Sequence, residues 1–463
     1  MRTVFDYGAV GDGAADDTAA FQAAATDEYV YAPATRPEGG AATYSIRDTI
    51  TLAGGHVIIE GTIDATQMPP GETWGEGVLF RAWGAEETST SYSTRIPKGT
   101  STLTSTNAFT PGDLLIIRNG QRPVKGMTRT DRSKGELKRV QEASPEQFQV
   151  SARTYFEYAS PSTITPISPV DVHFSGGGTI LCGGVGSGHT AISIKYGVRP
   201  TIRDLTIIGA EDTGIALNFC WAPRVENCRI EDCTSPVYGN TGYGILLGAG
   251  VVGGHVSGCT LFNCRHGVAG GGEIPAMFCS VDRCFADNAT LDCHEPAFEW
   301  QFLGNTVVGG VDGLLLRGQH SDAVLNRFHG NSGSSVRVKT WDQVTVQDGN
   351  RSLFNRVRSA GKAGVEADGR ATSLEPISYK PGLEIIGDRV EESGRVSDAS
   401  VIVTHATESM VYVTTRSNVG STGVEIGNSR LRSLAALGDD AATPVKLTNC
   451  TFSSNTTSED KGS

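Results

Sequence analysis

A six-residue motif that returns along the middle of the chain constrains the fold more than any other feature of the sequence. It begins with a polar residue or Cys and has Cys, Gly or Asn five positions later. Its starts lie 20 to 31 residues apart, a period typical of repeat architectures. Each repeat is too short to bury a core of its own. The copies are Asp204-LTII-Gly209, Cys228-RIED-Cys233, Cys259-TLFN-Cys264, Cys279-SVDR-Cys284, Asn305-TVVG-Gly310 and Asn326-RFHG-Asn331.

A second strand-like run follows each copy of the motif after a Gly or another small residue. Two short strands in each repeat, separated by Gly, Asn and Asp turns and without a helical period, indicate a right-handed parallel β-helix. Leucine-rich repeats are the nearest alternative, but their fixed Leu spacing is absent. The runs are Gly214-IALN, Gly244-ILLG, Gly267-VAGG, Thr290-LDCH, Gly313-LLLR and Ser335-VRVK.

The composition of the 463 residues is consistent with stacked strands. Of these, 58 are Gly, which supplies the positive φ of tight turns, and only 19% are charged. No apolar run is long enough to span a membrane, and the first residues lack the apolar core of a signal peptide, so we expect a soluble chain without a secretory signal. The net charge of −12 argues against a nucleic-acid partner.

The N-terminus carries a more specific string, Thr3-VFDYGAVGDGAADDTAAFQAA. It predicts a first strand, Gly turns and a short helix, capped by Asp17 or Thr18 and ending near Ala25, that covers the open end of the β-helix. We interpret Asp12, Asp16 and Asp17 as turn and capping residues rather than as a metal cluster.

The string DYGAVGDG followed by DDTAAFQAA resembles the start of the pectate-lyase-like β-helix superfamily. This superfamily is common in phage tail spikes and in bacterial polysaccharide lyases and glycoside hydrolases. The resemblance implies a polysaccharide partner and a virion tail or extracellular location. Together with the exposed sides expected of a β-helix, it also implies a homotrimer that binds other tail proteins.

Changes of pattern along the chain suggest four segments. We expect an N-terminal cap with the first coils over residues 1–66, a β-rich insertion over 67–169, the parallel β-helix over 170–455 and a flexible tail over 456–463. The insertion contains a basic stretch from Arg129 to Arg139, which is either solvated surface or a contact for an acidic partner or glycan.

Ten cysteines lie in the chain, most of them in the repeats. Matched Cys residues of successive repeats favour a buried stack of small apolar side chains. The C-x4-C spacing separates two thiols too far for a shared zinc ion, so we expect reduced thiols and no metal or other cofactor. Our alignment places Cys228, Cys259 and Cys279 on neighbouring coils at one position.

Aligning the second strand of each repeat separates two faces, because side chains alternate along a strand. The first and third positions after the leading small residue are apolar and are predicted to face inward, from Ile215 and Leu217 to Val336 and Val338. The fourth position is predicted to face outward and to stack residues of like charge beside two glycines. These residues are Asn218, Gly248, Gly271, His294, Arg317 and Lys339.

This outward face is our candidate site, because residues of both signs converge beside the space left by the glycines. The catalytic candidates are Asp292, Glu295, His294 and Glu273. The candidates for binding substrate are Arg317, Lys339, His266, Arg265, His320 and Trp341, and Trp300 is expected to offer a second stacking face for a sugar ring.

Two chemistries fit these residue types. Glycoside hydrolysis needs a pair of carboxyl groups, which Asp292, Glu295 and Glu273 could supply. β-Elimination from a uronic acid needs a cation for the sugar carboxylate and a base, for which Arg317 or Lys339 and His294 are suited. We favour hydrolysis of an anionic bacterial surface polysaccharide. A polysaccharide lyase and a non-catalytic receptor-binding or structural tail protein are the alternatives.

The basic column leads to an expectation about stability. If Arg317 and Lys339 repel each other across an open face, replacing either by Ala should weaken binding without lowering the stability of the free protein.

Overall fold

The computed structural model describes residues 1–71, 76–104, 108–124, 127, 130–235, 241–294, 296–338, 346–347 and 349–358. Beyond them it describes strand backbone only, together with the side chains of Val365 and Glu366. Two compact units make up the chain. The first is Met1–Pro123 with Asp131–Cys279, and the second is Val124–Thr130 with Ser280–Ser463.

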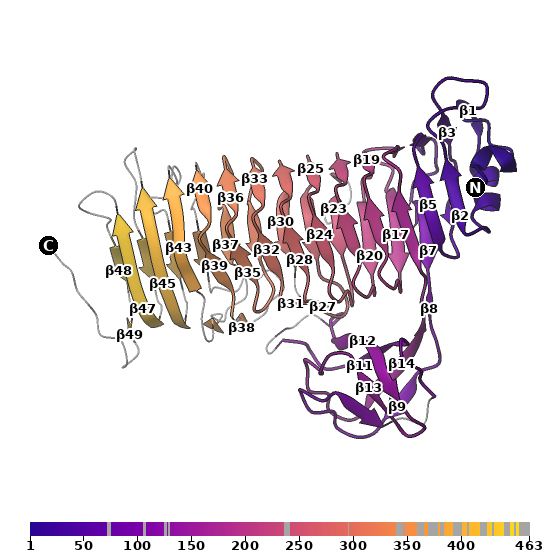
Figure 1. Ribbon diagram of the computed structural model, residues 1–463. Coiled ribbons are helices and arrows are strands. Elements are labelled where there is room, and N and C mark those ends of the chain that lie inside the picture. The colour runs from indigo at the N-terminus through magenta and orange to yellow at the C-terminus, as the bar shows by residue number, and fades with distance from the viewer. Residues whose placement is uncertain are drawn as a thin grey trace. The chain divides into compact units, whose positions relative to one another are not determined.

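Coils of parallel strands form the body of the first unit, in three columns (Figure 1). One column contains β2 (Tyr29–Ala32), β5 (Gly55–Ile59), β15 (Val172–Ser175), β18 (Thr201–Arg203), β21 (Arg224–Glu226) and β24 (His255–Ser257). The next contains β1 (Asp12–Asp16), β3 (Thr43–Ser45), β6 (Thr62–Asp64), β16 (Thr179–Leu181), β19 (Thr206–Ile208), β22 (Arg229–Glu231) and β25 (Thr260–Phe262). The third contains β4 (Ile50–Thr51), β7 (Val78–Trp83), β17 (Thr190–Lys195), β20 (Thr213–Asn218), β23 (Tyr243–Leu247) and β26 (His266–Gly270). The two-residue strand β27 (Ala276–Met277) follows β26.

The second unit repeats the same three columns. The first strand of its coils is β28 (Ser280–Asp282), β32 (Gln301–Leu303), β35 (Asp322–Val324) and β39 (Arg351–Leu353), and the second is β29 (Phe285–Asp287), β33 (Thr306–Val308), β36 (Arg327–His329) and β40 (Arg356–Arg358). The third is β30 (Thr290–Cys293), β34 (Leu314–Leu316), β37 (Val336–Val338), β41 (Val365–Asp368), β44 (Val401–Thr404), β46 (Val424–Gly427) and β48 (Val445–Thr448). Longer strands β43 (Glu384–Glu391), β45 (Thr407–Arg416) and β47 (Arg430–Gly438) continue the sheet to β49 (Thr451–Phe452), and β31 (Ala297–Phe298), β38 (Val346–Gln347) and β42 (Ser378–Tyr379) are short additions.

The predicted right-handed parallel β-helix is therefore confirmed. The predicted inward positions are confirmed as well: Ile215 aligns with Ile245 and Val268, Leu291 aligns with Leu314 and Val336, and all six side chains are fully buried. Stacked apolar side chains at one position build a continuous core that no single coil contains.

A short 3-10 helix η1 (Val4–Tyr7) and the α-helix α1 (Thr18–Ala24) precede the first coils. Asp17 occupies the N-cap position, but its carboxylate does not cap the helix. It accepts hydrogen bonds from the backbone N–H groups of Val10 and Gly11 instead. Asp12 likewise accepts from the N–H groups of Ala14 and Ala15. These carboxylates shape the turns of the cap.

No helix among the described residues is long and apolar enough to cross a membrane.

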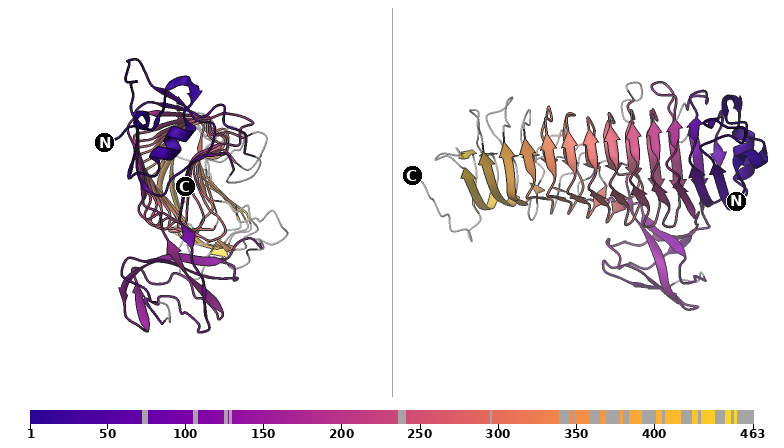
Figure 2. Two further views of the ribbon diagram at one scale, coloured as in Figure 1. Left: turned by 90° about the vertical axis from the view of Figure 1, so that its right-hand side faces the viewer. Right: turned by 45° about the horizontal axis from the view of Figure 1, so that its top comes forward.

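An antiparallel module interrupts the coils between β7 and β15 and stands to one side of them in Figure 2. Its strands are β8 (Ala85–Glu86), β9 (Thr90–Tyr92), β10 (Thr102–Thr104), β11 (Leu114–Asn119), β12 (Lys134–Ala143), β13 (Gln147–Val150) and β14 (Ser162–Ser168). An apolar seam joins the module to four successive turns of the coils. The seam contains Leu114, Ile116, Leu137, Ile167, Tyr196, Phe219, Ala249 and Ile274. The β-rich insertion of the predicted fold is present, while the segment boundaries 67–169 and 170–455 stay predictions.

The predicted register is wrong at Cys279. Cys228 and Cys259 directly precede β22 and β25, the second strands of their coils, whereas Cys279 directly precedes β28, the first strand of its coil. Cys284, before β29, is the residue at the matched position. The two strands of a coil begin five residues apart, so the same C-x4-C spacing arises at two different places in the coil, and sequence alone did not separate them. The nine described cysteines are free and buried, and Cys450 lies outside the described residues.

Candidate functional site

Asp292 lies on β30, and both of its carboxylate oxygens bind one guanidinium. Arg317 follows β34 on the next coil and donates from Nε to Oδ1 at 2.9 Å and from Nη2 to Oδ2. Asp292 is fully buried and Arg317 is 6% exposed. The expected open column of cations is therefore wrong at Arg317, because its long side chain reaches back one coil to neutralise a carboxylate on the same face.

The next coil has a similar arrangement. Arg337 on β37 pairs through Nη1 with Asp312 at 3.1 Å and through Nε with Glu366 at 3.3 Å, and the Ser334 hydroxyl donates to Glu366. Buried charges that find partners in this way are usually structural. The outer face of these strands in the second unit is thus filled with ion pairs.

The remaining sequence candidates of the second unit are two histidines, a buried tryptophan and three residues outside the described part of the chain. His294 and His320 are half-buried, and His320 packs against Gly349, where an added Cβ would lie 2.1 Å from its Nδ1. Trp300 was expected to offer a stacking face, and this is wrong: it is fully buried, 6.0 Å from the Phe302 ring. Glu295, Lys339 and Trp341 lie outside the described residues.

Glu273 is exposed and lies in the turn after β26, where the coils meet the antiparallel module. Its backbone oxygen accepts a hydrogen bond from Ser133 N of the module at 2.8 Å, and the next residue, Ile274, enters the apolar seam. These contacts give the turn a role in docking the module.

Arg265 and His266, in contrast, belong to a cluster at the start of the third-column strands. Thr190, Thr213, Tyr243 and His266 align on four successive coils. The His266 and Tyr243 rings stack at 5.6 Å, and the exposed Arg265 guanidinium lies 5.9 Å from the centre of the Tyr243 ring. Gly242, at φ +99, has its Cα directed at Arg265, where an added Cβ would lie 3.1 Å from Arg265 Cβ. This glycine allows the two coils to approach.

Asp212 is the acid of this cluster. It directly precedes β20 and is 8% exposed, and its Oδ2 accepts a hydrogen bond from the Thr190 hydroxyl at 3.0 Å. Its backbone oxygen accepts from the N–H groups of Gly242 and Tyr243, which ties it to the coil of the aromatic pair. Burial raises the pKa of Asp212 to about 6, and the nearby charge of Glu211 adds to that rise. Its Oδ1 has no hydrogen-bond partner within the described part of the chain.

Two buried residues, Glu211 and His189, are next to Asp212: Glu211 precedes it in the chain, and the backbone oxygen of His189 accepts a hydrogen bond from Asp212 N. Glu211 is fully buried and accepts hydrogen bonds from Gly188 N at 2.8 Å and from the Ser235 hydroxyl at 3.1 Å. His189 contacts the Pro69 oxygen through Nε2 and accepts from Gly183 N through Nδ1, and burial lowers its pKa. Nδ1 must be unprotonated to accept from Gly183, so this hydrogen bond and the burial both favour the neutral imidazole.

The chemistry of this cluster differs from that of the Asp292 pair. A carboxyl group that is protonated up to about pH 6 and keeps one oxygen without a partner can donate a proton. Tyr243, His266 and Arg265 beside it provide an aromatic face and a cation suited to a sugar that carries a negative charge. No group of His, Cys, Asp and Glu in the described ranges has the arrangement of a metal site.

The candidates predicted from the sequence include Arg265 and His266 of this cluster but not Asp212, Glu211 or Tyr243. The available signal was the adjacent acid pair directly before Thr213-Gly214, one coil after His189-Thr190. Both acids precede Gly214, the residue at which the alignment of this strand begins, so the alignment did not include them.

Comparison with known proteins agrees with a carbohydrate-related β-helix. The model of a pectate lyase-like family described as rhamnogalacturonase A/epimerase matches residues 1–268, more than half of the chain. The chain belongs to this family. No curated protein matches its sequence.

Several solved structures share the fold. The tailspike protein gp49 of Pseudomonas phage LKA1 is 17% identical with a TM-score of 0.70, and 97% of this chain aligns with 81% of that one. The tailspike gp61 of Pseudomonas phage phi297 is 17% identical with a TM-score of 0.63, and 97% of this chain aligns with 80% of that one. The Gp54 tailspike of Acinetobacter baumannii phage AP22 was solved in complex with an A. baumannii capsular saccharide. It is 13% identical with a TM-score of 0.65, and 98% of this chain aligns with 79% of that one.

Proposed function

We propose that this protein binds and hydrolyses a polysaccharide, with Asp212 giving the proton to the leaving glycosidic oxygen. The observation that carries the proposal is the buried Asp212 carboxyl, protonated up to about pH 6, beside Tyr243, Arg265 and His266. Asp212 would protonate the leaving oxygen as the glycosidic bond breaks, water would add its oxygen to the anomeric carbon, and the proton that the water loses would return through solvent to the Asp212 carboxylate. Membership of a family whose description names a rhamnogalacturonase supports hydrolysis.

The residues around Asp212 would share the work. Thr190 holds Oδ2, so the proton would reside on Oδ1, which is buried and has no partner among the described residues. Glu211 is sealed from solvent with both oxygens hydrogen-bonded, so we assign it as a positioning residue whose charge favours the protonated form of Asp212. Arg265 would bind a carboxylate or another anionic group of the glycan.

The test is activity on a panel of purified bacterial surface glycans, measured as release of reducing ends. Asp212→Asn should lower turnover by about 10²–10⁴-fold, as expected for loss of a positioned proton donor. Asp204→Asn is a matched control, since Asp204 is an exposed acid on the same coil, between β18 and β19. Full activity of Asp212→Asn on a confirmed substrate would refute the assignment.

A second candidate reaction is β-elimination, which one observation supports. Arg265 beside the stacked Tyr243 and His266 combines a cation for a uronate carboxylate with two groups able to move a proton. An unsaturated sugar product that absorbs in the ultraviolet would identify the lyase, while a saturated product supports hydrolysis.

We further propose that the protein is a homotrimeric component of a phage tail. The shared fold with three phage tailspikes supports this, and parallel β-helices can bury their flanks against one another in a trimer. Light scattering at micromolar concentration should give three times the chain mass of 48.8 kDa. A stable monomer would contradict the trimer, and binding without cleavage would leave a receptor-binding protein.

A further inference from the structure

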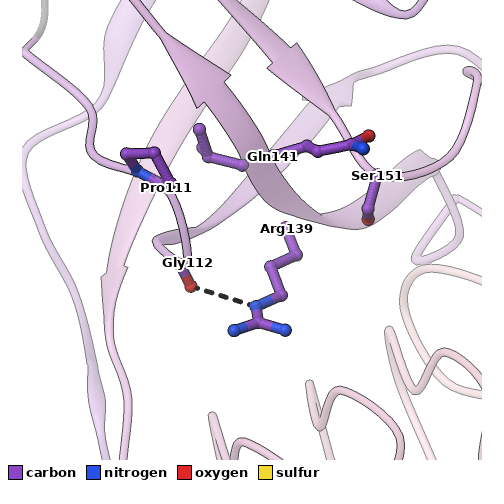
Figure 3. Close-up of a pocket in the computed structure, with 6 residues that line it drawn as sticks. Pro111, Gly112, Arg139, Gln141 and Ser151 are labelled. Atoms are coloured by element: carbon purple, nitrogen blue, oxygen red, sulfur yellow. Dashed lines mark hydrogen bonds between the residues drawn. The ribbon is translucent and has the colours of Figure 1, made fainter.

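A pocket of about 450 Å³ lies in the antiparallel module, away from the cluster around Asp212. Figure 3 shows Arg139 and Gln141 of β12 facing Ser151 and the turn before β11. The volume lies within the range of small-molecule sites. The lining residues are Pro111, Gly112, Arg139, Val140, Gln141 and Ser151.

A β-bulge builds this pocket. Arg139 is the last residue of β12 that pairs with β11, opposite Leu114. Val140 is the first residue of β12 that pairs with β13, opposite Val150. The register then shifts between Val140 and Glu142, so Gln141 is the extra residue. Bulges redirect side chains and occur often beside functional sites. Here the bulge lies between the Arg139 guanidinium and the Ser151 hydroxyl.

The Arg139 guanidinium forms a hydrogen bond through Nε, while its two terminal nitrogens have no hydrogen-bond partner among the described residues. Its Nε donates to the Gly112 oxygen at 3.4 Å, and its backbone oxygen accepts from Ser151 N at 2.8 Å. In Figure 3 the two terminal nitrogens point away from β12. Other arginines of the module have acidic partners: Arg95 pairs with Glu157 at 2.6 Å and Arg118 pairs with Glu86 at 2.7 Å. No carboxylate of the described residues forms an ion pair with Arg139.

We propose that this pocket is a binding site for the carboxylate of an acidic sugar residue in a glycan. The two free guanidinium nitrogens match the two oxygens of a carboxylate. The Gln141 amide and the Ser151 hydroxyl supply donors and acceptors for ring hydroxyls, and the exposed Pro111 ring offers an apolar face. The module then retains a polysaccharide at a place separate from the coils. This inference concerns binding and does not depend on the proposed hydrolysis.

Isothermal titration of the full-length protein with methyl galacturonoside, methyl galactoside and sulfate tests the site. All titrations use an Asp212→Asn background, so that no probe is consumed. The uronoside should bind, and Arg139→Gln should weaken that binding by at least tenfold. Arg139→Lys should recover part of the loss, because an ammonium keeps the charge but lacks the two-pronged geometry. Arg95→Gln, a change of an exposed arginine in the same module, should leave binding unchanged.

Three outcomes would overturn the proposal. Equal binding of the neutral galactoside would show that the carboxylate is not recognised. Binding of sulfate without the uronoside would make this a simple anion site. Unchanged uronoside binding in Arg139→Gln would place the binding elsewhere. Loss of cleavage in Asp212→Asn with uronoside binding intact would separate the two sites.

Discussion

Asp212 in the first unit and Asp292 in the second are both buried carboxyl groups next to strands of the third column, yet their surroundings are opposite. Asp292 gives both oxygens to Arg317. Asp212 receives one hydroxyl hydrogen bond, and Glu211 is its neighbour in the chain. A buried carboxylate with a bidentate cation stays ionised and holds structure, whereas one without a cation takes up a proton at higher pH. The difference separates a structural acid from one suited to chemistry.

Removing the cation from the Asp292 pair is the largest change to stability that we predict. Arg317→Ala leaves a fully buried carboxylate without its partner, which typically costs about 3–5 kcal/mol. The midpoint of urea unfolding should fall accordingly. This reverses the sequence-based expectation that the alanine variant would be no less stable, because that expectation assumed an open column of cations.

A double variant sharpens this result. Replacing Asp292 by Leu and Arg317 by Met together removes both charges and should recover most of the stability, since well-packed apolar pairs often replace buried ion pairs at little cost. If Arg317→Ala alone unfolds at the same urea concentration as the parent, the pair contributes nothing and the contrast with Asp212 fails.

The pH dependence of stability tests the other side of the comparison. Asp212 has a pKa of about 6 in the folded chain and an ordinary value of 3.8, so the folded state binds its proton more tightly. Its ionisation therefore lowers stability as pH rises from about 4 to above 6, by about 3 kcal/mol in total. Asp212→Asn removes this term and should be the more stable protein at pH 7.

The measurement compares urea unfolding of Asp212→Asn with that of the parent at pH 4 and at pH 7.5. Other groups titrate equally in both proteins, so the difference between them isolates Asp212. A gap of the same size at both pH values would show that the carboxyl has an ordinary pKa in the folded chain.

Sequence reasoning predicted the fold and part of the site for a common reason, the repeat. Alternation along strands identified the inward residues such as Ile215 and Leu314, because one column obeys one rule on every coil. It also placed Asp292 and Arg317 on the same face. It did not predict their pairing, which depends on how far an arginine reaches between coils. Asp212 was missed because its burial and its raised pKa come from Thr190 and Glu211 in turns that the strand alignment does not include.

The position directly before the second strand of a coil also changes along the chain, from cysteine as far as Cys284, at the start of the second unit, to asparagine on the later coils. In the first unit Cys228 and Cys259 direct their thiols at the Ile202 and Val225 oxygens, at 3.7 Å in both cases. In the second unit Asn326 donates to the equivalent Phe302 oxygen at 2.9 Å and to Asn355 at 3.0 Å, and its Oδ1 accepts from Asn305 N at 2.9 Å. One amide thus links three coils, while a thiol packs as a small apolar group.

Asn326→Ala should cost more than Cys259→Ala for that reason. The asparagine change leaves a buried N–H of Asn305 and the Phe302 oxygen without partners, at about 1–3 kcal/mol for each group left unsatisfied. The cysteine change removes one sulfur and a weak donor. Comparing the urea midpoints of the two variants measures the difference, and equal losses would mean that the amide ladder is no stronger than the thiol stack.

The smallest expected effect is the labelling of the thiols under native conditions. Burial raises the pKa of Cys182, Cys220, Cys279 and Cys293 to about 12, so at pH 8 almost none of these groups is a reactive thiolate. A short exposure to iodoacetamide followed by peptide mass spectrometry should leave all four almost unmodified in the folded protein and modify them fully in urea, and a longer exposure of the folded protein gives the order in which they become labelled. Labelling of Cys220 and Cys279, which lie in the first unit, ahead of Cys293 in the second would show that the coils of the first unit open more readily. That order is expected if the amide ladder makes the second unit the more rigid of the two, and the opposite order would contradict it.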